Sequence, residues 1–336
     1  MKKYLLSLIA LIIMTLSVNA GNIDVLPTMQ SKSMAQDRVW VGTFQLVWND
    51  FIDKVAHTII RFPDGTPDMV KDLNQQAFSI EDLTSKCYYT YTGKVKKNTK
   101  ASIVKAIRKK FNETSDILDQ LDLSPAANKV LIYAMLKKDF EFTQPFDTLG
   151  KYYFRDVRAD FFGITAQSDK LLRENVKVLF YNNPKDYAVV LTTKSGDEVY
   201  LYKIPHAKPF NFIYSDMMKK ASYYEGEKDF GERDELKVPN LKFFEEKTFE
   251  ELSNKRVKGT QIVIDKAIET VNFNMDNKGV QLKSEAAITM CTTAYNPEEE
   301  QPRYFYFDDT FILFLKEHDK RRPYFALRVH DISNYQ

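Results

Sequence analysis

Cysteine is scarce in this chain of 336 residues, which contains only Cys87 and Cys291. Two cysteines exclude a disulfide-rich scaffold, in which several bridges substitute for a hydrophobic core. A single bridge between Cys87 and Cys291 is one expectation for a chain that enters an oxidising compartment. Two separate thiols are the alternative, because pairing depends on the distance between the two Cα atoms, which the sequence does not give.

An excess of charge of one sign is also missing. The chain has 48 Lys and Arg residues against 46 Asp and Glu residues. Two of the cations, Lys2 and Lys3, fall in a predicted leader, so the rest of the chain is neutral. Neither nucleic acid nor an anionic membrane surface is therefore an expected partner.

Only one long apolar run occurs, and it lies at the start. Residues 1–20, "MKKYLLSLIALIIMTLSVNA", combine a short basic stretch, an apolar run and a small residue, Ala20, at a plausible cleavage point. This pattern predicts a secretory signal peptide, with an uncleaved anchor as the alternative and no further membrane span. We expect an exported protein, periplasmic or secreted, whose residues 21–336 form one domain.

Motifs of catalysis and metal binding are absent from the sequence. The four histidines, at 57, 206, 318 and 330, have no spacing that places two ligands on one helix face, and neither GxSxG nor GxxxxGK occurs. The acidic run at 225–235 lacks the ordered alternation of a calcium loop and is interpreted as a solvated turn. We expect no enzymatic activity, no metal and no cofactor.

What the chain does contain is a helical front and a β-rich back, which predicts an α+β fold. Apolar residues at helical spacing predict helices over 39–60, 68–83 and 100–121. From residue 129 onward, apolar runs between turn residues predict strands. The predicted strands are 129–136, 176–183, 187–194, 198–205, 235–243, 262–275, 304–318 and 322–332, with helices at 210–224 and 248–255.

Five segments resemble, in the same order, motifs of the serpin family. They are "KVLIYAMLKKDFEFTQPFD" (129–147), "YAVVLTTKSGDEVYLYKIP" (187–205), "ELKVPNLKFFEEKTFEEL" (235–252), "IDKAIETVNFNMDNKGVQLKSEAAITM" (264–290) and "YFYFDDTFILFLKEHDKRRPYFALRVHDI" (304–332). The resemblance implies a divergent, bacterial-type exported serpin. Its fold is then a helical N-terminal part packed on a large mixed or antiparallel sheet, with smaller sheets and an exposed reactive-centre loop at about 284–303.

The resemblance also implies a function. A serpin loop is cut by a serine or cysteine protease, and the part before the cut inserts into the main sheet as a new strand while still bound to the protease. The chain is then a monomeric inhibitor with a target protease as its partner. A non-inhibitory serpin-fold binding or substrate protein is the first alternative, and an unrelated secreted α+β binding protein is the second.

Insertion requires a loop that can become a central strand. The predicted hinge residues are Ser284, Glu285, Ala286, Ala287, Ile288, Thr289 and Met290. Alternate side chains of a strand face opposite sides, so Ser284 and Ala286 face the core and Glu285 and Ala287 face outward. An ordinary half-buried strand has the same pattern, and Gly279 stands four residues earlier than the family's glycine.

The bond cut by the protease is predicted only as a window. Its residues are Ala294, Tyr295, Asn296, Pro297, Glu298, Glu299 and Glu300. The window contains no Arg, Lys or Leu, so a trypsin-like target is not expected. Tyr295 and Glu299 instead indicate chymotrypsin-like or acid-directed proteases.

Overall fold

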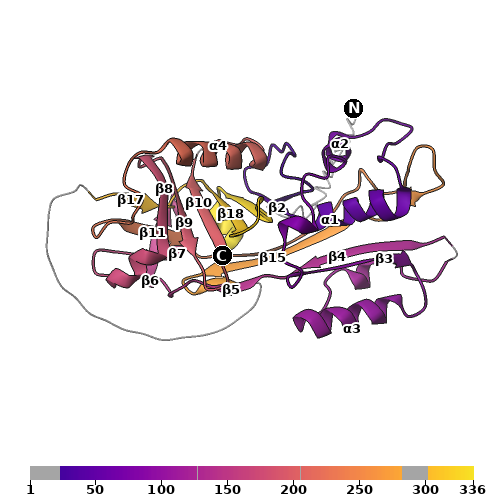
Figure 1. Ribbon diagram of the computed structural model, residues 1–336, viewed down its shortest axis with the longest axis horizontal. Helices are drawn as coiled ribbons and strands as arrows, with labels where there is room; N and C mark the ends of the chain where they lie inside the picture. The colour runs from indigo at the N-terminus through magenta and orange to yellow at the C-terminus, as the bar shows by residue number, and fades with distance from the viewer. Residues whose placement is uncertain (1–22, 127, 205, 282–301) are drawn as a thin grey trace, which may run out of the picture.

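The computed structural model describes residues 23–126, 128–204, 206–281 and 302–336, and the predicted α+β class is confirmed. Most strands gather at one end of the molecule beneath a long helix, and three shorter helices surround a pair of strands at the other end (Figure 1). One strand, β15 (Ile268–Asp276), runs from the first end towards the second.

The largest sheet has seven strands in the order β1-β2-β19-β18-β10-β9-β8, and only β1 and β2 pair in parallel. These strands are β1 (Asp24–Leu26), β2 (Arg38–Val41), β8 (Val176–Asn183), β9 (Asp186–Thr192), β10 (Asp197–Lys203), β18 (Phe311–Glu317) and β19 (Phe325–Val329). The central strands β2, β19, β18, β10 and β9 are buried on both faces, whereas residues of the edge strand β8 alternate between buried and exposed. The strands predicted between 176 and 205 are thus confirmed.

Helix α4 (Phe210–Tyr223) covers one face of this sheet and confirms the helix predicted at 210–224. Its buried residues Phe210, Ile213 and Met217 recur at helical spacing. The rings of Phe210 and Tyr214 contact Phe314 of β18 at centroid distances of 6.2 and 5.2 Å.

A second sheet has the strand order β17-β11-β7-β6. Its strands are β6 (Asp147–Phe154), β7 (Val157–Ile164), β11 (Glu235–Pro239) and β17 (Tyr304–Tyr306). A glycine is required at 163, where an added Cβ would lie 1.8 Å from the carbonyl oxygen of Leu236 in β11.

The third sheet has the order β12-β15-β16-β5, and a separate antiparallel pair, β3–β4, lies beside it. The strands are β3 (Tyr88–Lys94), β4 (Val130–Leu136), β5 (Asp139–Glu141), β12 (Leu241–Thr248), β15 and β16 (Gly279–Gln281). A two-stranded pair, β13 (Lys255–Arg256) with β14 (Val263–Ile264), completes the described strands.

The remaining helices lie on both sides of the β3–β4 pair (Figure 1). Helix α1 (Thr43–Asp50) continues as a π-helical segment, η1 (Phe51–Ala56), and packs with α2 (Asp68–Leu73) in one apolar cluster. Helix α3 (Thr99–Phe111) packs against the opposite face of β3 and β4 in another cluster. Short 3-10 turns are η2 (Ile80–Asp82), η3 (Leu118–Gln120), η4 (Lys170–Asn175) and η5 (Ile332–Tyr335).

The predicted helices of the front part are real but shorter. Residues 39–41 belong to β2, where they pair with β19, so the helix predicted at 39–60 begins only at Thr43. The helix predicted at 68–83 divides into α2 and η2. The helix predicted at 100–121 ends at Phe111, because Asn112 adopts a left-handed conformation with φ 56°.

Three predictions in the β-rich part are wrong in detail. Pro239 does not interrupt one strand at 235–243: it ends β11, and β12 begins at Leu241 in a different sheet. The helix predicted at 248–255 is absent, because Thr248 still pairs with Ile268 and hydrogen-bonded turns follow. The strands predicted at 262–275 and 304–318 are each divided in two, into β14 and β15 and into β17 and β18.

Candidate functional site

Most of the predicted site residues lie outside the described residues. The hinge from Ser284 to Met290, the cleavage window 294–300 and Cys291 all fall within 282–301. Their roles therefore stay predictions. The structure describes the places where this segment leaves and rejoins the fold, at β16 and at β17, and it describes Cys87.

Cys87 is buried just before β3, with 8% of its surface exposed. Its thiol donates a hydrogen bond to the carbonyl oxygen of Thr84 at 3.0 Å and lies 3.4 Å from a carboxylate oxygen of Glu317. Burial raises the pKa of the Cys87 thiol to about 11. A thiol in this environment is a poor nucleophile at neutral pH.

Strand β16 holds the start of the predicted loop segment inside the third sheet. Its residues pair with β15 on one side and with β5 on the other, both antiparallel. Gly279 opens the strand, and a Cβ there would lie 2.2 Å from the carbonyl oxygen of Phe140. The early position of Gly279 in the sequence thus has a reason: the chain enters the sheet at this glycine.

Beyond Gln281 the third sheet opens into a cleft, which we call the β4–β15 cleft. Its two long walls are residues 129–137, around β4, and residues 261–274, around β15. Among the described strands, β4 pairs only with β3, and β15 meets β16 only at residues 274–276. Both walls therefore present a strand edge that no described strand pairs with.

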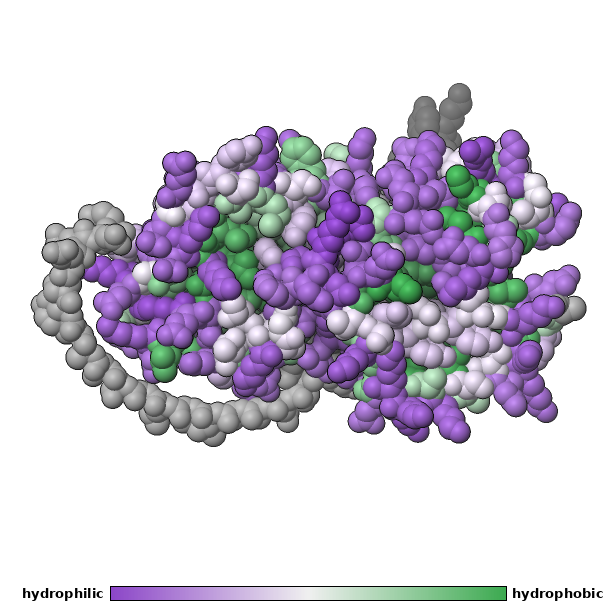
Figure 2. All heavy atoms as spheres, viewed as in Figure 1, coloured by the Kyte–Doolittle hydropathy of each residue, from purple (hydrophilic) through white to green (hydrophobic). Residues whose placement is uncertain are grey.

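The cleft has a volume of about 1510 Å³ and is covered on its two other sides. Helix α1 and segment η1 form one cover, through Phe44, Val47 and Phe51. Residues 113–123, between α3 and β4, form the other. Figure 2 shows apolar surface between α1 and β4, where the cleft lies.

Glu269 of β15 is the unusual polar group of this cleft. It is 4% exposed, and its Oε1 accepts a hydrogen bond of 2.6 Å from the Thr43 hydroxyl at the start of α1. Its Oε2 has no hydrogen-bond partner among the described residues. Burial raises the pKa of Glu269 to about 8, against the hydrogen bonds from Thr43 and the backbone of Phe44.

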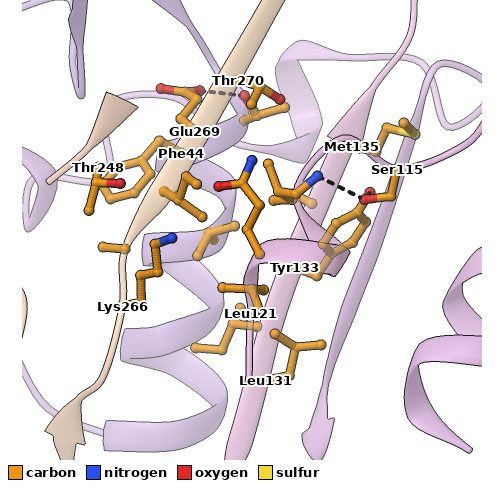
Figure 3. A pocket seen from close by; sticks show the side chains of 18 of the residues that line it. Phe44, Ser115, Leu121, Leu131, Tyr133, Met135, Thr248, Lys266, Glu269 and Thr270 are labelled. Carbon is orange, nitrogen blue, oxygen red and sulfur yellow. Dashed lines mark hydrogen bonds between the residues drawn. The ribbon is translucent and has the colours of Figure 1, made fainter. Parts of the chain in front are cut away.

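The side chains of the two walls are seen together in Figure 3. Tyr133 and Ser115 lie on the β4 side, where the Tyr133 hydroxyl is 3.3 Å from that of Ser115. Glu269 and Thr248 lie on the opposite side, near Phe44 of α1. The lining is mixed: apolar side chains such as Phe44 and Leu131 lie beside polar ones such as Ser115, Thr248 and Lys266.

A buried ionic cluster fixes the end of the cleft next to β5. Lys138, between β4 and β5, lies 2.8 Å from Asp197 of β10 and 2.5 Å from Glu317 of β18. The Tyr324 hydroxyl donates a further hydrogen bond of 2.9 Å to Asp197. This cluster ties the β4–β5 junction to the seven-stranded sheet.

Sequence reasoning missed both Glu269 and this cluster. A signal for Glu269 exists: it occupies the same strand face as Val271, Phe273 and Met275, which are all buried. A carboxyl group in an apolar stripe is uncommon and indicates a special position. The Lys138 cluster has no local signal, because its members are far apart in the chain.

Two further searches were negative for the described part of the chain. No group of three or more His, Cys, Asp or Glu side chains there could hold a metal ion. No helix in that part is long and apolar enough to cross a membrane.

No model of a protein family matches the sequence, and no curated protein matches it. Solved structures do resemble the chain. Serpin48 of the insect Tenebrio molitor is 14% identical over 88% of this chain and 91% of its own, with a TM-score of 0.47. Thyroxine-binding globulin in complex with thyroxine is 11% identical over 68% of this chain and 63% of its own, with a TM-score of 0.43.

A second structure, of human thyroxine-binding globulin in complex with its ligand, is 10% identical over 84% of this chain and 94% of its own, with a TM-score of 0.42. Serpin structures are thus among those to which the chain is similar.

Proposed function

We propose that this chain is an exported, monomeric protease inhibitor that traps a serine or cysteine protease by inserting its own cleaved loop as a strand. The protein itself has no catalytic role. The observation that carries this proposal is the β4–β15 cleft, which is bounded by two strand edges that no described strand pairs with and begins where β16 ends. Export follows from the predicted signal peptide and remains part of the proposal.

The pairing of β16 with β15 sets the register of such an insertion. Asn274 pairs with Gln281, and each further step along the segment moves one residue back along β15. Continued in this register, Ser284 meets Val271 and Ala286 meets Glu269.

The pairing of β16 with β5 gives an independent register on the other wall. Gln281 pairs with Asp139, and continuing this register into β4 brings Ala286 opposite Ala134. Ala134 packs against the same core as Val271, so both registers place Ala286 on the core side, which supports this alignment.

The chemistry of the two faces supports this alignment. Val271 and Phe273 of β15 are buried in the main core, whereas Asn272 is exposed. Side chains of paired strand residues share a face, so Ser284 and Ala286 would lie towards the core. Small side chains fit there, and Glu285 would face outward.

Insertion would give hydrogen-bond partners to two strand edges that no described strand pairs with. An inserted central strand of about nine residues forms backbone hydrogen bonds on both sides, each contributing about 0.5–1.5 kcal/mol net, for a total on the order of 10 kcal/mol. Residues 113–123 must move aside first, and the hydrogen bond from Gln120 to Glu246 of β12 would break. That movement is a barrier, so speed of insertion decides between inhibition and simple cleavage.

The test is incubation of residues 21–336 with a panel of serine and cysteine proteases. Inhibition predicts a covalent complex on a denaturing gel. Insertion predicts that protein cut within 294–300 gains thermal stability, by more than about 10 °C. Cleavage with neither outcome would remove the mechanism.

A matched pair of variants tests the alignment. Ser284→Arg places a charge against the apolar core face, where an unpaired charge is costly, so we expect cleavage without complex or stabilisation. Glu285→Arg introduces the same side chain on the outward face and should leave insertion intact.

A non-inhibitory binding protein is the second candidate. Ile288 and Met290 favour it, because their bulk slows insertion of the segment. Stabilisation after cleavage without any covalent complex would support this candidate.

A further inference from the structure

Three tyrosines on one face of the second sheet have no role in the proposed insertion. Tyr304 and Tyr306 of β17 flank Phe305, which is fully buried, so their rings lie on the outer face of the strand. Tyr152 reaches the same face from β6 at the opposite edge of the sheet, and both it and Tyr306 contact Lys237 of β11. Tyr152 and Tyr304 expose 40% and 42% of their surfaces. We call Tyr152, Tyr304, Tyr306 and Lys237 the tyrosine face.

Contacts within the sheet hold these rings in position. The ammonium group of Lys237 lies 4.0 Å from the ring centroid of Tyr306 and 4.6 Å from that of Tyr152. Glu235 of β11 accepts a hydrogen bond from the Tyr306 hydroxyl and lies 3.8 Å from the Lys237 ammonium group. The ring of Tyr304 lies 5.3 Å from that of Tyr306. Side chains that are already ordered lose little entropy on binding, and tyrosine is enriched among the residues that dominate protein–protein interfaces.

The length of chain between this face and the predicted cleavage window indicates the partner. Tyr304 follows Glu300 by only four residues, which span at most about 14 Å in a fully extended chain. It follows Ala294 by ten residues, which span at most about 36 Å. A globular protease of about 220 residues is about 45 Å across. A protease bound at this window therefore has surface within reach of the tyrosine face.

We propose that the tyrosine face is a second contact surface for the protease that cuts the loop, separate from the loop residues that enter its active site. The rings pack against an apolar patch beside the substrate cleft of the protease. Such a contact discriminates between proteases whose clefts accept the same loop residues. This proposal rests on the proposed function in one respect, since a protease must cut within 294–300, but it does not require the cut loop to insert.

The test compares wild-type and variant proteins as substrates of each protease that cuts within 294–300. Tyr152→Ala removes an exposed ring of the face, and we expect the second-order rate constant of cleavage to fall at least about fivefold for the protease that cuts the wild type fastest. Tyr153→Ala is the matched control. Tyr153 is the next residue of β6, is 63% exposed and points away from the face, towards Arg158. This control should stay within about twofold of the wild type.

A second variant tests the residue that positions the rings. Lys237→Met keeps an unbranched side chain beside Tyr152 and Tyr306 but removes the ammonium group that contacts both rings. We expect the rate constant to fall about two- to fivefold. In both variants the rate of cleavage at saturating concentration should be unchanged, because a docking contact strengthens binding without touching the bond that is cut.

Three outcomes would overturn the proposal. They are an unchanged rate constant for Tyr152→Ala with every protease that cuts the window, an equal loss for Tyr153→Ala, and a loss confined to the rate at saturation. Cleavage without complex or stabilisation would remove the insertion mechanism but still allow this comparison. Covalent complexes that form equally fast on the wild type and on Tyr152→Ala would remove the second contact surface and leave insertion intact. A panel in which no protease cuts within 294–300 would contradict both proposals.

Discussion

Replacing Glu269 with glutamine should change how the stability of this protein depends on pH. In the folded protein the pKa of Glu269 is about 8, against an ordinary value of 4.5. The folded state therefore holds a proton that the unfolded state releases between these values, so the wild-type free energy of unfolding falls as the pH rises through this window. At about 1.36 kcal/mol per unit, the loss is about 4 kcal/mol by pH 8.

Glutamine does not titrate, so Glu269→Gln should gain stability relative to the wild type by about 4 kcal/mol between pH 5 and pH 8.5. Urea unfolding at both pH values measures this as a relative shift of the midpoint of about 1 M or more. Glu251→Gln, at an exposed turn after β12, is the matched control and should show no such change.

The opposite result would refute this reasoning. Glu269 contacts the N-terminal end of α1, where an ionised carboxylate is favourable. If this effect outweighed burial, the variant would lose stability relative to the wild type as the pH rises. A difference that does not depend on pH would show that Glu269 does not titrate in this range.

Three further outcomes follow from the same structure. After cleavage within 294–300, the Ala286→Lys protein should be more stable than the Ser284→Lys protein by about 3–5 kcal/mol, or roughly 6–10 °C in the melting midpoint. The reason is that only the lysine at 286 meets a buried carboxyl group. Equal midpoints would contradict the register. Gly279→Ala should lower the free energy of unfolding by about 1–3 kcal/mol, because the added Cβ clashes with the backbone of β5. Gly231→Ala is the control: the nearest atom to its added Cβ is 3.3 Å away, so urea unfolding should show a smaller loss. In the native protein Cys87 should react slowly with iodoacetamide, as measured by mass spectrometry, and rapid labelling would contradict its burial. A disulfide bridge to the second cysteine would block labelling even in denaturant, as long as no reductant is present.

The strands that local pattern could predict are those whose burial is continuous. β9 and β10 read as uninterrupted apolar runs, and their sheet partners need not be known to recognise them. The strand predicted at 235–243 is divided because Pro239 ends β11 and β12 begins at Leu241. The change of sheet at this point depends on two residues that are distant in the sequence. Phe161 pairs with Pro239 before the break, and Met275 pairs with Leu241 after it.

The helix predicted from Thr248 shows the reverse case. A threonine followed by acidic residues favours a helix start, but the pairing of Thr248 with Ile268 extends β12 instead. Long-range pairing of this kind is invisible to local propensity.

The same limit applies to the candidate site. The alternation of the hinge at 284–290 was readable, because it is a local property of the segment. The cleft that could receive it was not, since its walls lie around residues 130 and 270. Only Glu269, a carboxyl group in the buried stripe of β15, carried a sequence signal for that cleft.

Side-chain burial and backbone pairing differ within β15. The side chains of Val271 and Phe273 belong to the core. Every second backbone amide of β15, however, faces the β4–β15 cleft, where no described strand pairs with it. Amide hydrogen exchange follows backbone pairing. We therefore expect adjacent amides of β15 to exchange at alternately slow and fast rates, and a strand entering the cleft to make the whole series slow.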